Sequence, residues 1–164
     1  MEFEKTINGI FLENQDDEKF FPLVSDLLKE EIGFKLLTFT VLHPNQKYIQ
    51  RIFSSNEDVY PVGGVKDVPD NYWAELTIKQ KKSFIGNNRK EIEKYFFDHK
   101  TITSLGCESI LNQVVVFNKK TIGTINLLNV EDHFQKSHLI KTALLSKYVA
   151  PLFLHHIVKI NVDN

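Results

Sequence analysis

Cysteine is almost absent from this sequence, since Cys107 is the only one among 164 residues. A single cysteine cannot form an internal disulfide, and it excludes the paired Cys-x-x-Cys spacings of zinc and redox sites. This usage is typical of a reducing compartment. The amino terminus, Met-Glu-Phe-Glu-Lys, also lacks the basic start and continuous apolar stretch of a secretory signal. We therefore expect a cytoplasmic protein.

Long hydrophobic runs and a surplus of basic charge are absent as well. The most apolar late stretch, residues 148–158, is interrupted by Pro151 and by two histidines, and it is too short to span a bilayer. The net charge is −1, whereas proteins that bind duplex nucleic acid usually carry a basic surplus. His133 and His138 are five residues apart, so a helix would not place them on one face. We expect no membrane, nucleic-acid or metal partner.

The residues that are present predict one core closed by a helix at each end. Hydrophobic residues make up 42% of the chain and include 13 phenylalanines, enough for a core at this length. Asp16 and Asp17 precede apolar residues spaced three and four apart, and Gly33 follows them, which predicts a helix. Asp132 and Gln135 have capping-box spacing and open a last helix. One face of that helix carries Ile140, Leu144, Tyr148 and Leu152, and Ala143, Leu145 and Phe153 widen it.

Two hairpins are predicted between these helices. Residues 36–42 and 48–54 form the first, about a His-Pro-Asn-Gln turn. Residues 109–117 and 121–128 form the second, about the turn at residues 118–120.

The segment 54–106 between the hairpins is irregular and will be called the excursion. It contains two short predicted helices, over 72–79 and 91–97, and a short strand at 84–85. Long excursions of this kind often serve as a lid or a pocket wall.

This order of elements predicts an α+β fold with a central antiparallel sheet. The amino- and carboxy-terminal helices would cover one face, and the excursion would cover the other face above a cavity. We expect a single domain over residues 1–164, with its core at about 16–155.

Several segments, in this order, resemble a branch of bacterial GAF-domain proteins. They are Arg51-Ile-Phe-Ser-Ser-Asn56, Tyr60-Pro-Val-Gly-Gly64 with Lys66, Phe97-Asp98-His99, Ser104-Leu-Gly-Cys-Glu-Ser109 and Gly123-Thr-Ile-Asn-Leu-Leu128. The resemblance implies a ligand pocket and terminal helices that often pair two protomers. Such domains bind cyclic nucleotides, tetrapyrroles, haem, amino acids or other metabolites. The signature of the cyclic-nucleotide regulators is missing, and the lone cysteine argues against methionine sulfoxide reduction and bilin attachment.

Arg51 is the leading candidate for contact with a ligand. It alternates in phase with Ile49 and Phe53, which places it on the more apolar face of its strand. A guanidinium there needs an anionic or carbonyl partner. Either a salt bridge with an acid such as Asp98 or Glu108, or a carboxylate or phosphate of a ligand, would satisfy it.

The remaining candidates for ligand binding are aromatic and amide side chains. Tyr60, Trp73 and Phe84 could form apolar pocket walls or belong to the core. Asn112 and Asn126 lie in apolar strands, so their amides either bond within the sheet or line the pocket. Ser109, from the segments quoted above, completes the predicted ligand-binding set.

No catalytic residue is predicted. Asp98 and His99 are neighbours that seldom face one another, so helix termination explains them better than acid–base chemistry. Cys107 is better explained as a small buried residue than as a nucleophile.

The sequence thus predicts a sensory domain that binds a small organic ligand of unknown identity. It would act through an unidentified partner chain and pair into a homodimer through its terminal helices. Two alternatives stay open: an enzyme on the same scaffold that uses Cys107 and His99, and a purely structural dimerisation module.

Overall fold

The computed structural model describes residues 1–13 and 16–163. The chain begins with two helices, α1 (Glu2–Glu13) and α2 (Asp17–Glu31), followed by the hairpin of β1 (Leu36–Leu42) and β2 (Tyr48–Ser54). The excursion contributes β3 (Val65–Asp67), α3 (Tyr72–Ala74), the π-helix η1 (Glu75–Lys79), β4 (Phe84–Gly86), α4 (Arg89–Tyr95) and α5 (His99–Ser104). The second hairpin, β5 (Ser109–Phe117) and β6 (Lys120–Asn129), leads into α6 (Lys136–Asp163).

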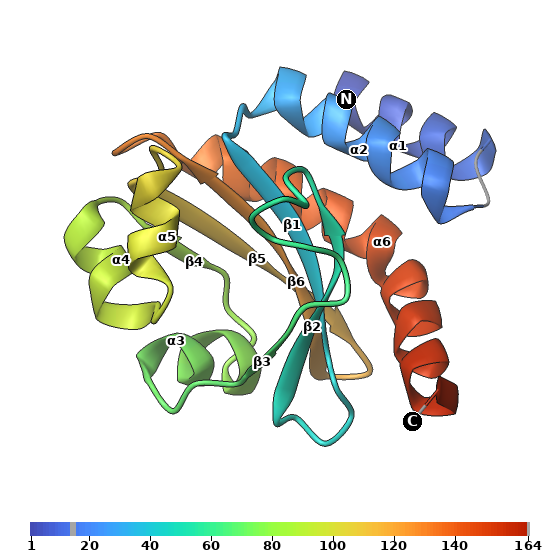
Figure 1. Ribbon diagram of the computed structural model, residues 1–164. Helices are drawn as coiled ribbons and strands as arrows, with labels where there is room; N and C mark the ends of the chain where they lie inside the picture. Colours follow the sequence, from blue (N-terminus) through green and yellow to red (C-terminus); the bar gives the residue numbers. More distant parts are fainter. Residues whose placement is uncertain (14–15, 164) are drawn as a thin grey trace.

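The strands form one antiparallel sheet in the order β3-β2-β1-β6-β5-β4. Helices α1, α2 and α6 lie on one side of it, and the helices of the excursion lie on the other (Figure 1). The α+β fold with helices on one face and the excursion on the other is therefore confirmed.

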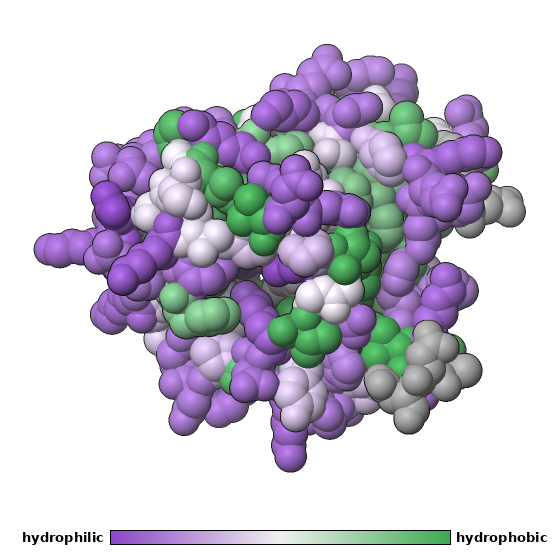
Figure 2. Space-filling model, viewed as in Figure 1, coloured by the Kyte–Doolittle hydropathy of each residue, from purple (hydrophilic) through white to green (hydrophobic). Residues whose placement is uncertain are grey.

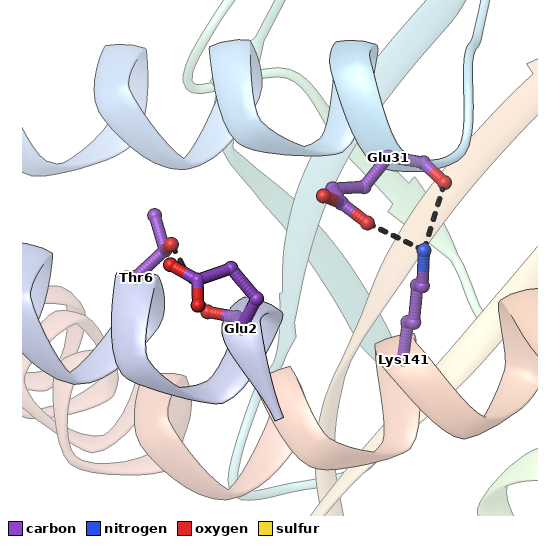
Figure 3. Close-up of polar contacts among 4 residues, drawn as sticks. All are labelled: Glu2, Thr6, Glu31 and Lys141. Carbon is purple, nitrogen blue, oxygen red and sulfur yellow. Dashed lines mark hydrogen bonds and ion pairs between the residues drawn. The ribbon is translucent and has the colours of Figure 1, made fainter.

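The helix-covered face of the sheet is dry and aromatic. Phe39 of β1 is completely buried and contacts Phe21 of α2 and Phe153 of α6, with ring centroids 5.4 and 6.0 Å apart. A polar contact also links two of the helices on this face. The Lys141 ammonium of α6 binds the carboxylate and the backbone carbonyl of Glu31 in α2 (Figure 3). Helices α2 and α6 are thus joined directly as well as through the sheet.

The face under the excursion has its own hydrophobic cluster. Its buried members include Leu36, Trp73, Phe84, Phe96 and Ile110. On the outside of this half of the molecule, hydrophobic side chains appear in separate groups among hydrophilic ones (Figure 2). Within the described part of the chain, no helix is both long enough and apolar enough to cross a membrane.

The excursion contains more regular structure than its composition indicates. The strand β3 and the helix α5 were not predicted, because three to six residues are too few for a clear hydrophobic period. The predicted helix over 72–79 is divided into α3 and η1.

The second hairpin turn is shorter than predicted. Asn118 and Lys119 both have positive φ, at 49° and 62°, as in the tight two-residue turns whose twist matches that of the strands. Lys120 therefore belongs to β6.

The predictions for the last helix are wrong in two respects. It begins at Lys136, and Asp132 lies outside it with a φ of 54°, so the predicted capping box does not form. The centre of its buried face is also displaced: Leu145 and Phe153, predicted at the margin of that face, are fully buried together with Val149, whereas Ile140 is 57% exposed. Leu144, Tyr148 and Leu152 lie beside that face and are partly buried. Helix α1 packs on this flank of α6, where Phe11 contacts Tyr148. Pro151 lies inside α6 without ending it.

Gly123 of β6 marks the closest approach between the sheet and α6. A Cβ atom at this position would lie 2.3 Å from the Thr40 carbonyl oxygen and 2.6 Å from Phe153 Cδ2. We expect Gly123→Ala to lower the free energy of unfolding by about 1–3 kcal/mol, because neither the strand nor the packed ring can yield without strain. Urea denaturation of the purified protein measures this change.

Gly9→Ala is the matched control for that substitution. Gly9 lies inside α1, and a methyl group added there would have no other atom within 4 Å. Alanine should there raise the free energy of unfolding by up to about 1 kcal/mol through helix propensity. Equal effects of the two substitutions would contradict the close packing at Gly123.

Candidate functional site

A small cavity lies between the sheet and the excursion. Its volume is about 50 Å³, room for several water molecules or part of a small organic compound. Its apolar lining comes from Leu36, Ile49, Phe96, Ile102, Ile110 and Leu128. Its polar lining comes from Thr38, Thr40, Arg51, Tyr60, Lys66, Trp73, Asp98, Asn112, Thr124 and Asn126. We call this space the inner cavity.

A chain of hydrogen bonds, here called the polar ladder, runs across one wall of the inner cavity. The Trp73 indole donates to Asn112 Oδ1 at 2.9 Å, and Asn112 Nδ2 donates to Asn126 Oδ1 at 2.6 Å. Asn126 Nδ2 then donates to the hydroxyls of Thr38 and Thr40, at 3.2 and 3.3 Å. The ladder therefore joins the excursion to three neighbouring strands.

Strand register explains why these side chains meet. Asn126 of β6 is paired with Thr38 of β1 on one side and with Asn112 of β5 on the other. Paired residues of adjacent strands project from the same face, so all three point toward the excursion. Thr40 and Thr124 form the next such pair, and their hydroxyls are 2.7 Å apart.

A β-bulge in β2 directs Arg51 toward the inner cavity. Phe39 pairs with Phe53 and Thr40 pairs with Arg51, so Ile52 is an extra residue between the two pairs. Ile52 and Phe53 both pack in the helix-side core, while Ile49 and Arg51 line the cavity. The predicted common face of Arg51 and Phe53 is therefore wrong, because a bulge shifts the alternation by one residue.

Arg51 is held by the loop that follows β2. Its Nη1 donates to the Pro61 carbonyl at 2.8 Å, and its guanidinium lies 4.9 Å from the centre of the Tyr60 ring. Gly64 leaves room for this group, because a Cβ there would lie 2.6 Å from Nη1. Among the described residues Arg51 forms no ion pair, so the predicted salt bridge with Asp98 or Glu108 is absent. Its Nε is buried without a hydrogen-bond partner.

Asp98 presents the opposite charge to the same cavity. Tyr60 donates its hydroxyl to Asp98 Oδ2 at 2.7 Å, while Oδ1 is buried without a partner. Burial, together with this hydrogen bond, raises the pKa of Tyr60, which keeps the phenol protonated as the donor. Lys66 of β3 is a half-buried second cation, and burial lowers its pKa while the charge of Asp98 raises it.

A second hollow adjoins the inner cavity and shares Lys66, Trp73, Phe96 and Asp98 with it. It has a volume of about 340 Å³, and Pro69, Tyr95 and Phe97 form part of its wall. Phe97 is 81% exposed. We call this hollow the outer chamber, and it gives the inner cavity a neighbouring space that is open to solvent.

The structure brings together five of the seven predicted ligand-binding residues. Arg51, Tyr60, Trp73, Asn112 and Asn126 all line the inner cavity.

The other two predicted residues do not line it. Phe84 packs between Tyr95 and Phe96 in the core. Ser109 donates its hydroxyl to the Val130 carbonyl at 2.5 Å and so anchors the end of β6.

Lys66 belongs to the segments that resemble GAF-domain proteins but was not predicted to bind a ligand, and Asp98 was considered only as a partner of Arg51, as a helix terminus or as part of the enzyme alternative. Lys66 lies on a strand that was not predicted. The alternation of Thr38 and Thr40 with apolar residues was a usable signal, since it marks a polar stripe on one face of β1.

Cys107 is completely buried, and burial raises its pKa to about 11. Its thiol is therefore protonated at neutral pH, whereas the thiolate is the nucleophile. Among the described residues no hydrogen bond links Cys107 to His99, and no group of three His, Cys, Asp or Glu side chains could hold a metal ion.

Solved structures resemble this arrangement over nearly its whole length. A GAF domain from an Acinetobacter phosphoenolpyruvate-protein phosphotransferase is similar with a TM-score of 0.75 and 12% identity, and the match covers 98% of this chain and 96% of that one. The chain has the GAF fold. The fold implied by the sequence resemblance is thus confirmed.

Other structures with the GAF fold differ in what they do. The phycocyanobilin-bound GAF domain of a cyanobacterial phytochrome matches with a TM-score of 0.69, 13% identity and coverage of 96% and 95% of the two chains. A type II free methionine-R-sulfoxide reductase from Thermoplasma acidophilum matches with 0.64, 16% identity and coverage of 94% and 96%. No protein-family model and no curated protein matches the sequence.

Asn112→Ala tests the polar ladder. The substitution leaves the Trp73 indole and the Asn126 amide without a shared partner, so we expect the free energy of unfolding to fall by about 1–3 kcal/mol. Trp73 is the only tryptophan, so its fluorescence reports on this site alone. Its emission should shift to longer wavelength as water replaces the amide.

Asn8→Ala on the exposed side of α1 is the control, and it should leave the emission unchanged and should not lower the stability, since alanine favours the helix. An Asn112→Ala protein with wild-type emission would show that the indole does not depend on this amide.

Proposed function

We propose that this chain is a regulatory domain that binds a small organic molecule in the inner cavity and the outer chamber. The observation that carries the proposal is a pair of buried polar atoms without partners, Arg51 Nε and Asp98 Oδ1, on two residues that line one cavity. Burying charged groups without partners is costly, and native proteins rarely leave them unsatisfied. A ligand that bonds to these atoms removes that cost.

The comparison with known structures supports a binding role. One domain with this fold carries phycocyanobilin, and others belong to two-component sensor histidine kinases. We infer that the present chain likewise converts the presence of a small molecule into a signal.

The polar ladder supports a route for that signal. A ligand beside Trp73 would stabilise the excursion, and the ladder connects this tryptophan to β5, β6 and β1. Helices α2 and α6 pack on the other face of the same strands. Binding would therefore shift the balance between arrangements of the terminal helices, which a partner protein could read.

We propose binding without catalysis. The support is the state of Cys107, whose buried thiol has a pKa of about 11 and does not provide a thiolate at neutral pH. The enzyme alternative needs Cys107 to become exposed and paired with His99.

We also propose that two copies pair through their terminal helices. Leu12 of α1 and Val158 of α6 are 69% and 61% exposed, although both are large and apolar. A groove of about 980 Å³ lies between the same helices and contains Phe11, Phe20 and Leu152. A second copy would bury this apolar surface, which a lone protomer leaves in water.

Thermal unfolding in the presence of a metabolite library tests the ligand proposal. A ligand at about 100 times its dissociation constant stabilises by about 2.7 kcal/mol, which raises Tm by roughly 5–10 °C for a chain of this size. We expect this shift in the wild type and in Lys47→Ala, an exposed control with the same loss of charge.

Arg51→Ala should abolish the shift, because it removes the cation that lines the cavity. A ligand that stabilises Arg51→Ala as much as the wild type would place the binding site elsewhere. No shift with any compound would contradict the binding role.

Light scattering at micromolar concentration tests the dimer. We expect a mass of twice the 19.1 kDa of one chain. The double variant Leu12→Ser, Val158→Ser should lower it to one chain without loss of stability, because both side chains are exposed. A monomeric wild type would contradict the proposal.

A further inference from the structure

The charged groups of the inner cavity are arranged in an unusual way, because opposite charges share it without pairing. Arg51, Lys66 and Asp98 all line the cavity, yet no ion pair joins Asp98 to either cation in residues 1–13 and 16–163. An ion pair would be the simplest way to satisfy all three groups. Something therefore keeps the charges apart.

Tyr60 is the side chain that separates them. Its ring lies under the Arg51 guanidinium, 4.9 Å from it, and its hydroxyl binds Asp98 Oδ2 at 2.7 Å. The phenol thus fills the direct path between the guanidinium and the carboxylate. Each charged group uses one polar atom for the protein, Nη1 on the Pro61 carbonyl and Oδ2 on Tyr60.

Each group also keeps one polar atom unused. Arg51 Nε is a donor without an acceptor, and Asp98 Oδ1 is an acceptor without a donor, and both atoms are buried. A simple anion would satisfy Arg51 and leave the Asp98 carboxylate facing a like charge. A simple cation would satisfy Asp98 and face Arg51 and Lys66. A molecule that carries both a carboxylate and an ammonium group can bond to both atoms and match each with the opposite charge.

We infer that the ligand is a small zwitterion, a free amino acid or a similar short amino carboxylic acid. Its carboxylate accepts a hydrogen bond from Arg51 Nε beside Lys66, and its ammonium group donates to Asp98 Oδ1. This inference rests on the proposed function and specifies the ligand class for the same cavity.

The lining of the two hollows indicates how the rest of the ligand fits. Ile49, Ile110 and Leu128 line the inner cavity, whereas the outer chamber combines Tyr95, Phe97 and Pro69 with the charged side chains Asp67, Glu93 and Lys94. The inner cavity is small, at about 50 Å³, so a side chain longer than a few atoms must extend into the outer chamber. We therefore expect the part of the ligand inside the inner cavity to be apolar.

Isothermal titration of the full chain with a matched set of compounds tests the inference. The set consists of free amino acids, their N-acetyl derivatives, which lack the positive charge, and their amides, which lack the negative charge. We expect at least one free amino acid to bind, and both of its derivatives to bind about tenfold more weakly or worse, since each has lost a charge-assisted hydrogen bond.

Asp98→Asn sharpens the test at the amine end. Asparagine keeps the shape and can still accept the hydrogen bond from Tyr60, so only the charge is removed. The affinity for the free amino acid should fall at least tenfold, whereas the N-acetyl derivative should bind no more weakly than to the wild type. Asp58→Asn, at an exposed site outside both hollows, should change neither affinity.

Two results would overturn the inference. N-acetyl derivatives that bind the wild type as tightly as the free amino acids would show that no amine is recognised, and this result does not require a folded variant. Unchanged amino acid affinity in a folded Asp98→Asn protein would show the same.

Different results would contradict the proposed function and the inference about the ligand class. If no amino acid binds but another metabolite stabilises the protein in an Arg51-dependent way, the zwitterion is wrong and the binding role stands. If neither amino acids nor any other metabolite binds, both are wrong.

Discussion

The hydrogen-bonded side chains that run from Trp73 to Thr38 and Thr40 hold the two halves of this molecule together. An amide buried between strands must have partners, and Asn126 finds them only because its neighbours on both sides are in register. The same bonds hold the indole of Trp73 against the sheet. The hydrogen bonds that form the cavity wall also stabilise the sheet, so a substitution that breaks them affects both the cavity and the stability of the fold.

One face of the sheet carries the main hydrophobic core, and the other face carries the candidate binding site. The helix side is packed mainly with apolar side chains, including rings such as Phe39 and Phe153 that need no polar partner. The excursion side has threonine, asparagine and charged groups around a hollow. The bulge at Ile52 lets a single strand serve both faces, since Phe53 enters the core and Arg51 the cavity. A dry core on one face allows the other face to keep unpaired polar atoms.

The sequence predicts the long elements well and the short ones poorly. Both hairpins and the helices α2 and α6 follow from hydrophobic periods of two and three to four residues, whereas the twelve-residue helix α1 was not predicted. The bulge leaves no such period, so the alternation that assigns Arg51 to the cavity face assigns Phe53 to the wrong face. Of the five predicted site residues that line the cavity, Arg51, Asn112 and Asn126 were found as polar side chains in apolar strands, whereas Tyr60 and Trp73 were found as aromatic side chains of the excursion. The place of Lys66 in the site could not be predicted, since the three-residue β3 is defined by its pairing with β2 and not by its own composition.

Pro151 gives the last helix a fixed place to bend. Proline has no backbone N–H, so the carbonyl of Lys147 lacks its usual helical donor. Leu145 and Val149 anchor the helix to the sheet before this point, and Phe153 is the last side chain that is fully buried. In the final turns, Leu154, Ile157 and Ile160 are only partly buried against the core. A force applied to the carboxy-terminal end of α6 would therefore bend the helix near Pro151, where a backbone hydrogen bond is missing, before it bends the part that contains Leu145 and Val149.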